Sequence, residues 1–225
     1  MKAHKYRFEK ILDRLPESSK ELNLLDIGTT PFTLFLKEKY PDYEISTLDR
    51  TDLMENRCKE KDIEFKSCNL DKVSIPFEDN QFDIVIFTEV LEHIFAPPSK
   101  VLNEINRILK NNGKLIISVP NIASLHRRVK LLLGRNPLPH PDNQFKKDWV
   151  HGHGHLHLYT RKELISILKD SDFKIKSKKF LQPNILSNPK NEGSTTRIVK
   201  TIYYTITKLF PPFRNIIFVE CIKNA

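Results

Sequence analysis

Four short apolar runs, separated by helical patterns, constrain the fold of this chain more than any other feature. They cover residues 23–27, 43–48, 82–87 and 114–119, and they consist mostly of leucine, β-branched and aromatic residues. Runs of this length are typical of strands buried on both faces of a sheet. Helical patterns at 32–40 and 99–109 lie between them, and a β-α-β succession requires parallel strands joined by crossover helices. The sequence therefore predicts an α/β fold with a Rossmann-like, doubly wound sheet and helices on both faces.

Three more segments bring the predicted sheet to seven strands. They cover residues 63–66, 173–179 and 216–222, and we expect the last strand to run antiparallel to the others. Further helices are predicted at 4–15, 122–133, 161–169 and 197–209, with Thr160 and Glu163 forming a capping box and Asn111-Asn112-Gly113 ending the helix before strand five. The 225 residues fit a single domain. We expect its core at 22–180, a substrate lid at 121–160 and a basic C-terminal elaboration at 181–225.

The basic charge of the chain is concentrated in its second half. Residues 1–110 carry 17 Lys and Arg against 21 Asp and Glu, whereas residues 111–225 carry 20 against 7, which gives −4 and +13 for a net +9. Either these side chains are simply solvated or the second half faces an anionic partner or substrate. The basic amphipathic stretch 122–135 could be an ordinary lid helix, could grip a phosphate-bearing acceptor, or could lie on an anionic membrane surface.

Composition also bears on where the protein works. No stretch approaches the roughly 20 uninterrupted apolar residues of a spanning helix, and the N-terminal residues do not read as a secretory signal. Cys58, Cys68 and Cys221 are scattered without metal-binding spacing, which suits a reducing compartment. We therefore expect a cytoplasmic protein, with peripheral contact at the inner face of the membrane as an option.

Polar residues at the ends of the predicted strands are the candidates for ligand binding. Ligands of doubly wound sheets lie outside the carboxyl ends of the strands. The first strand ends in Asp26 and Gly28, and glycine at such a turn lets the backbone approach a ligand. Asp49 ends the second strand, where a carboxylate can accept hydrogen bonds from both hydroxyls of a ribose. The alternative is that Asp26 and Asp49 only cap neighbouring elements.

Several of these motifs together resemble one known family. LLDIG, the strand-end Asp49, FDIVIFTEVLEHI and NEINRILKNNGKLIISVPN are similar to class I S-adenosylmethionine-dependent methyltransferases. PNIASLHRRVKLLLGRNP and GHLHLYTRKELISILKDSDFKI resemble the branch that methylates small molecules, lipids and glycans. The resemblance covers roughly residues 22–180. It implies S-adenosylmethionine as cofactor and S-adenosylhomocysteine as product. It also implies the residues that contact the cofactor: Asp26 and Gly28 beside the methionine moiety, Asp49 at the ribose, Asn69 and Leu70 at the adenine, and Thr88 and Glu89 on the floor of the site.

The glycine loop departs from the family pattern. The family usually has Gly-x-Gly-x-Gly, whereas this chain has Gly28-Thr29-Thr30-Pro31-Phe32. Thr30 stands where the second glycine is expected, and its hydroxyl could donate to the cofactor carboxylate. Pro31 suits the first turn of a helix. The departure leaves open a non-catalytic protein on a methyltransferase fold.

Histidines supply the candidate catalytic groups. His151, His153, His155 and His157 alternate, and the family resemblance favours His155 as a general base on a hydroxyl acceptor, with structural packing as the alternative. His93, after strand four, is a second candidate for proton transfer. Alternating histidines can bind a metal. No cysteine or acidic residue nearby in the sequence completes such a site, so we expect no metal.

The most favoured function is O-methylation of a small molecule, lipid intermediate or glycan precursor by direct displacement at the sulfonium methyl. An RNA methyltransferase is a second option, supported by the basic second half but by no recognisable RNA-binding module, so nucleic acid is the less favoured partner. A non-catalytic binding protein is the third. The sequence names neither the acceptor nor the oligomeric state.

Overall fold

The computed structural model describes residues 2–17, 22–72, 74–138, 154–182 and 194–224, and its centre is a seven-stranded sheet in the order β3-β2-β1-β4-β5-β7-β6. The strands are β1 (Asn23–Ile27), β2 (Glu44–Asp49), β3 (Glu64–Ser67), β4 (Phe82–Thr88), β5 (Leu109–Pro120), β6 (Phe173–Leu181) and β7 (Ile216–Lys223). Strands β1 to β5 pair in parallel, whereas β7 is antiparallel to both β5 and β6. The predicted fold class, including the antiparallel last strand, is confirmed.

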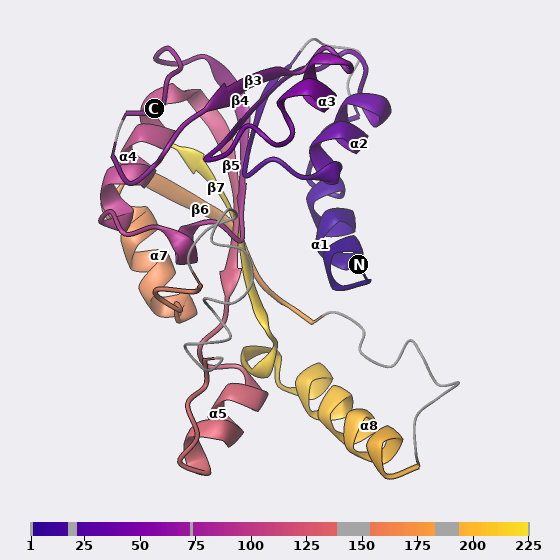
Figure 1. Ribbon diagram of the computed structural model, residues 1–225. Helices are drawn as coiled ribbons and strands as arrows, with labels where there is room; N and C mark the ends of the chain where they lie inside the picture. The colour runs from indigo at the N-terminus through magenta and orange to yellow at the C-terminus, as the bar shows by residue number, and fades with distance from the viewer. Residues whose placement is uncertain (1, 18–21, 73, 139–153, 183–193, 225) are drawn as a thin grey trace.

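Helices cover both faces of this sheet (Figure 1). One face carries α1 (Lys2–Leu12), α2 (Pro31–Lys39) and α3 (Glu55–Lys59), and the other carries α4 (Pro98–Ile108) and α7 (Arg161–Asp170). Two more helices, α5 (Leu125–Leu132) and α8 (Ser194–Leu209), extend from one end of the sheet, away from the layered body. Short 3-10 helices lie at Leu91–His93 (η1) and Pro211–Phe213 (η3).

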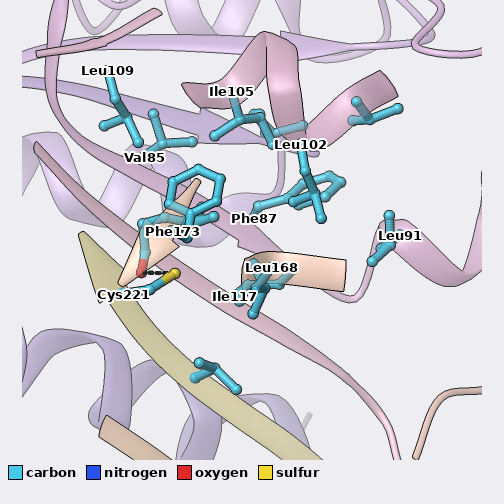
Figure 2. Close-up of a cluster of buried hydrophobic side chains, with 14 of the residues drawn as sticks. Val85, Phe87, Leu91, Leu102, Ile105, Leu109, Ile117, Leu168, Phe173 and Cys221 are labelled. Carbon is cyan, nitrogen blue, oxygen red and sulfur yellow. Dashed lines mark hydrogen bonds between the residues drawn. The ribbon is translucent and has the colours of Figure 1, made fainter. Parts of the chain in front are cut away.

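Each face of the sheet has its own buried cluster because β-strand side chains alternate between faces. The cluster under α4 and α7 includes Val85, Phe87, Leu102, Ile105 and Phe173, and Figure 2 shows these side chains packed together. The cluster under the other helices includes Ile11, Leu24, Phe32, Leu36, Tyr43 and Phe218. Two complete apolar layers therefore hold the strand ends that form the site.

The structure differs from the predicted elements in a few places. Helix α4 ends at Ile108, and β5 begins directly at Leu109, so the Asn-Asn-Gly turn expected at 111–113 is wrong as a helix end. Asn112, with φ +61°, lies within the assigned strand. Helix α5 is shorter than the predicted 122–133, and the short helix α3 was not predicted.

Some predicted features fall on residues that the structure does not describe. They are His151, His153, part of the predicted substrate lid at 121–160 and part of the predicted C-terminal elaboration at 181–225. Among the described helices, none is both long and apolar enough to span a bilayer.

The order of the sheet fixes where a ligand can bind. The chain winds from β1 outward through β2 to β3, and then returns to the other side of β1 to form β4 and β5. The connection from β1 to β2 and the connection from β3 to β4 lead to opposite sides of β1. Such a switch point in strand order opens a crevice at the carboxyl ends of the strands, here between β1 and β4. Ile27 pairs with Phe87 there, so the loops after β1 and β4 lie beside each other.

Candidate cofactor and acceptor site

A cavity of about 1090 Å³ lies at the carboxyl ends of β1, β2 and β4. Small-molecule pockets usually hold about 300–1,000 Å³, so this one has room for a nucleoside cofactor and an acceptor together. All ten site residues predicted from the sequence line it except Asp26, which lies buried directly beneath. The fold therefore brings together residues that are spread over 130 positions of the chain.

Gly28 makes the tight turn after β1 that the sequence predicted. Its φ of +93° is in the region that favours glycine, and a Cβ placed there would lie 2.8 Å from Cγ2 of Val90. The amide of Gly28 donates to the carbonyl of Leu48 at 2.9 Å. The turn thus joins β1 to β2 and keeps the backbone close to the cavity.

Asp26 is buried beneath the glycine turn. Its Oδ2 accepts a 2.6 Å hydrogen bond from Oγ1 of Thr33 on α2, and its carbonyl accepts a 2.7 Å bond from Oγ1 of Thr47. Burial raises the pKa of Asp26 to about 7, against the smaller effects of Thr33 and Arg7, which lower it. This carboxyl lies beneath the cavity and does not line it, and its position beside the methionine moiety stays a prediction.

Thr30, at the position where the family has glycine, caps helix α2. Its Oγ1 accepts from the amide of Phe32 at 3.2 Å, and its own amide donates to Oγ1 of Thr33 at 3.0 Å. Pro31 occupies the first helical position, as predicted. A hydroxyl keeps one donor hydrogen while it accepts, so Thr30 still has a proton to offer a carboxylate in the cavity. Thr30 therefore caps helix α2, whereas the glycine usual at this position would make the backbone more flexible.

Asp49 ends β2 with its carboxylate held in place. Oδ1 accepts from the amide of Thr51 at 3.0 Å and lies 3.4 Å from the Thr51 hydroxyl. Among the described residues, Oδ2 has no hydrogen-bond donor, and the side chain lines the cavity. An oriented carboxylate with one available oxygen is suited to bind a vicinal diol.

The loop after β3 forms the next part of the wall. Cys68 donates its amide to the carbonyl of Asp49 at 2.8 Å, which places Asn69 and Leu70 in the cavity wall next to Asp49. Asn69 Oδ1 accepts from the amide of Asp71, and Asp71 Oδ1 accepts from the amides of Phe95 and Ala96. These bonds join the loops after β3 and β4 into one rigid wall, with Leu70 as its apolar surface.

Thr88 and Glu89 form the floor at the end of β4. Glu89 has φ +58°, and its amide donates to the carbonyl of Ser118 at 2.8 Å. Its Oε1 accepts from the Ser118 hydroxyl at 2.9 Å, while Oε2 forms an ion pair with Arg7 at 3.5 Å. Burial raises the pKa of Glu89 and Arg7 lowers it. The strained backbone directs this carboxylate into the cavity.

Helix α1 contributes site residues that sequence reasoning missed. Arg7 is buried against Glu89, and Phe8 stacks on Phe32 with ring centroids 4.1 Å apart. Lys5, Glu9 and Leu12 also line the cavity. The predicted helix at 4–15 indicated an apolar face, but its arginine could be assigned to a carboxylate only once the fold was known.

The predicted catalytic histidines meet at the same cavity. His93 follows β4 on η1, His155 comes from the segment before α7, and their rings lie edge to face at 4.9 Å. Glu92, fully buried, lies between them, with its Oε1 3.9 Å from His93 Nε2 and 4.0 Å from His155 Nε2. Burial lowers the pKa of His155 to about 4, with a smaller contribution from His93. The sequence argument missed Glu92 as an acidic partner of His155.

His157 does not share the surroundings of His155. Its Nε2 lies 2.8 Å from Oε1 of Glu163, and its ring packs against Tyr159 at 4.6 Å. Burial raises the pKa of Tyr159 to about 12, so this phenol stays neutral. Within the described part of the histidine run, only His155 lines the cavity.

The doubly wound sheet and the cavity at its switch point define a class of α/β proteins that bind a nucleoside cofactor. A model of the methyltransferase domain family matches residues 2–178 of the chain. The chain therefore belongs to this family of S-adenosylmethionine-dependent methyltransferases, and the sequence resemblance is confirmed.

Similar proteins agree with this family. The chain is 40% identical over 114 residues to an uncharacterised protein of Methanocaldococcus jannaschii, covering 48% of this chain and 45% of that protein. It is 28% identical over 120 residues to the malonyl-[acyl-carrier protein] O-methyltransferase of Alcanivorax borkumensis, covering 51% and 40%. The alignments span less than half of either relative. A phosphoethanolamine N-methyltransferase of Haemonchus contortus, solved with S-adenosylmethionine, has the same fold, with a TM-score of 0.63, 16% identity and coverage of 97% and 52%.

The residues present fit S-adenosylmethionine. Gly28 leaves free the space beside Val90 that a Cβ would fill, Asp49 would offer an oxygen to the ribose, and Leu70 would provide an apolar wall for the adenine. When bound, this cofactor supplies an electrophilic methyl group on a sulfonium. The protein would hold the acceptor in line with that methyl group, exclude water from the site and accept the proton of the acceptor.

Proposed function

We propose that the protein methylates a hydroxyl oxygen of a small molecule, a lipid intermediate or a glycan precursor. The observation that carries this proposal is the group of Glu92, His93 and His155 in the wall of the cofactor cavity. An alcohol or phenol is a weak nucleophile until its proton is accepted or displaced. Two imidazoles beside a carboxylate supply groups that orient such a hydroxyl and help to remove its proton.

Two further observations support an oxygen acceptor in an enclosed site. The malonyl-[acyl-carrier protein] relative is an O-methyltransferase by name. Much of the rest of the wall consists of apolar side chains: Phe8, Leu12, Ile27, Phe32, Phe35, Leu48, Leu70, Val90 and Ile94. A wall of this kind favours the carbon skeleton of a small or lipid-like acceptor.

The test measures S-adenosylhomocysteine formation with pairs of acceptors that differ only in the nucleophile, such as a phenol and the matching aniline, and with bulk RNA. We expect turnover with hydroxyl acceptors, little with their amine partners and none with RNA. His155→Ala should lower kcat at least tenfold, whereas the neighbouring His157→Ala, which changes a residue outside the cavity, should not.

The other outcomes decide between the alternatives. Transfer to the amine or to RNA, with the hydroxyl acceptor untouched, contradicts the proposal. A folded protein that binds neither S-adenosylmethionine nor S-adenosylhomocysteine is a non-catalytic member of the family, because the Thr30 loop would then have removed the cofactor site.

A further inference from the structure

Glu92, His93 and His155 form a compact cluster that neither the fold nor the cofactor explains. One donor atom from each of the three lies within 4.8 Å of the others. Glu92 has no exposed surface, and neither of its carboxylate oxygens has a hydrogen-bond partner among the described residues. A buried polar group without a partner costs free energy, so such a carboxylate points to a missing ligand.

Backbone hydrogen bonds assemble this cluster independently of any ligand. The carbonyl of Glu92 accepts from the amide of Leu156 at 2.8 Å and from that of His157 at 3.4 Å. The amide of His93 donates to the carbonyl of Val90 at 2.9 Å, which forms the 3-10 turn. The segment before α7 is therefore fastened to the turn after β4, and the donor atoms are held close together before a ligand arrives.

Two arginines near Glu92 make contacts with other groups. Arg7 pairs with Glu89, and Arg127 donates through Nη1 to the carbonyl of Asn121 at 2.8 Å. Burial and the nearby Glu89 raise the pKa of Glu92, and the two arginines, acting at longer range, lower it only in part. Among the residues that the structure describes, only the two imidazoles form an ion pair with Glu92, and no side chain donates a hydrogen bond to its oxygens.

We propose that Glu92, His93 and His155 bind a divalent transition-metal ion in the wall of the cavity. The donor atoms lie no more than 4.8 Å apart, so a point at their centre is at most about 2.8 Å from each of them. Side-chain rotations that shift each donor atom by less than about 1 Å would reach the usual metal–ligand distances of about 2.0–2.2 Å. Two imidazoles and one carboxylate favour Mn²⁺, Fe²⁺, Co²⁺ or Zn²⁺ over Ca²⁺, which prefers oxygen ligands. Glu92, buried and without a hydrogen-bond donor among the described residues, would be the anionic ligand.

Three protein ligands leave coordination positions open toward the cavity. This step rests on the proposed function, because it gives the ion a role toward a hydroxyl acceptor. A bound hydroxyl loses its proton to solvent more readily on a metal ion. The oxygen then forms its bond to the methyl carbon while the carbon–sulfur bond breaks, giving the methyl ether, S-adenosylhomocysteine and one released proton.

The first test titrates chelator-treated protein with Co²⁺ and follows visible absorption, and then measures Mn²⁺ and Zn²⁺ binding by calorimetry. We expect one ion per chain, and about 100-fold weaker binding in His155→Ala and Glu92→Gln. His157→Ala is the matched control and should bind as tightly as the wild type. S-adenosylhomocysteine binding reports whether each variant is folded, and His93→Ala replaces Glu92→Gln if that variant does not fold.

The results separate this inference from the proposed function. A site with no metal affinity, or affinity equal in wild type and His155→Ala, overturns the inference, and hydroxyl methylation in chelator then remains valid without it. Specific metal binding without hydroxyl methylation supports the site and overturns the proposed function.

A second surface, independent of the cavity, is formed by helices α5 and α8. Exposed apolar side chains gather on or beside both helices, and they are Val129, Leu131, Leu132, Leu133, Ile198, Val199, Ile202, Leu209 and Phe210. Leu132 is 86% exposed. We call this set the α5–α8 face. Both helices extend from the same end of the sheet (Figure 1), and a solvated protein rarely leaves such a set uncovered.

Polar contacts connect the two helices. Asn215 Oδ1 accepts from the hydroxyl of Tyr203 on α8 at 2.9 Å and lies 3.1 Å from Nδ1 of His126 on α5. The guanidinium of Arg128 lies 5.4 Å from the ring centre of Phe213, next to α8. Asn215 therefore links α5 to α8, although the two helices are about 70 residues apart in the sequence.

The charge around this face is entirely basic. Residues 121–138 and 194–219 contain no Asp or Glu, and they contain eight basic residues, which are Arg127, Arg128, Lys130, Arg135, Arg197, Lys200, Lys208 and Arg214. Apolar side chains among basic ones are the composition of helices that lie in an anionic lipid interface. We infer that the α5–α8 face docks on an anionic membrane surface, which extends the membrane contact expected for 122–135 to a second helix.

The test is co-sedimentation with neutral phosphatidylcholine vesicles and with vesicles that contain phosphatidylglycerol. We expect binding to the anionic vesicles that weakens as salt rises. Lys130→Glu should weaken it at least about fivefold, as should Leu132→Ser, whereas Lys174→Glu on the exposed side of β6 should not. Absence of vesicle binding overturns the inference, as does a dimer or an RNA complex that is lost in Leu132→Ser while vesicles remain unbound.

Discussion

Substituting Asp49 should weaken cofactor binding by an amount that the structure lets us estimate. One oxygen of Asp49 is used by Thr51, which leaves the carboxylate oriented toward the cavity. Two hydrogen bonds from ribose hydroxyls to a charged acceptor contribute about 1.5 kcal/mol each, or about 3 kcal/mol together. Asp49→Ala should therefore raise the Kd for S-adenosylmethionine by roughly 150-fold, since each 1.4 kcal/mol is about a factor of ten.

Calorimetric titration of the wild type, Asp49→Ala and Asp49→Asn measures this effect. The asparagine keeps one acceptor oxygen, so its Kd should rise about tenfold. Thr51→Ala is the matched control, because it removes only the long 3.4 Å hydroxyl contact, and its Kd should change less than about threefold. A change of less than threefold in Asp49→Ala, with the protein folded, would refute the ribose role of this carboxylate.

Three more predictions concern the glycine turn and Asp26. Gly28→Ala should destabilise the fold by about 1–3 kcal/mol in urea unfolding, because of its positive φ and the 2.8 Å approach to Val90, and adding Val90→Ala should relieve only the steric part. Thr33→Val should cost about 1–3 kcal/mol by the same assay, because it removes the donor to the buried Asp26 carboxyl; an unchanged midpoint contradicts this. The raised pKa of Asp26, about 7 in the folded state, makes its contribution to stability complete below about pH 4 and lost as pH rises through 7, by at most roughly 4 kcal/mol. Asp26→Asn should therefore flatten stability between pH 4 and 7, and an equally steep profile in the variant would show that other groups cause the slope.

Nine of the ten candidate residues line the cavity, and sequence reasoning could identify them because they lie at boundaries with local signals. Each follows a buried strand or starts a helix, and parallel strands align their carboxyl ends at one edge. Gly28 at a positive φ and Thr30 before Pro31 could be read from turn and capping chemistry alone. The expected antiparallel last strand is confirmed by the pairing of β7 with β5 and β6.

The sequence by itself determined the strands, most helices and the edge of the sheet at which the cavity lies, since these follow from short-range periodicity and turn residues, and the combined motifs indicated the family through their resemblance to it. Only the tertiary structure decided that Arg7 of α1 meets Glu89, that Glu92 lies between His93 and His155, and that Asn215 links α5 to α8. These contacts join segments tens of residues apart, and nothing in local periodicity specifies which side chains loop closure and packing will bring together.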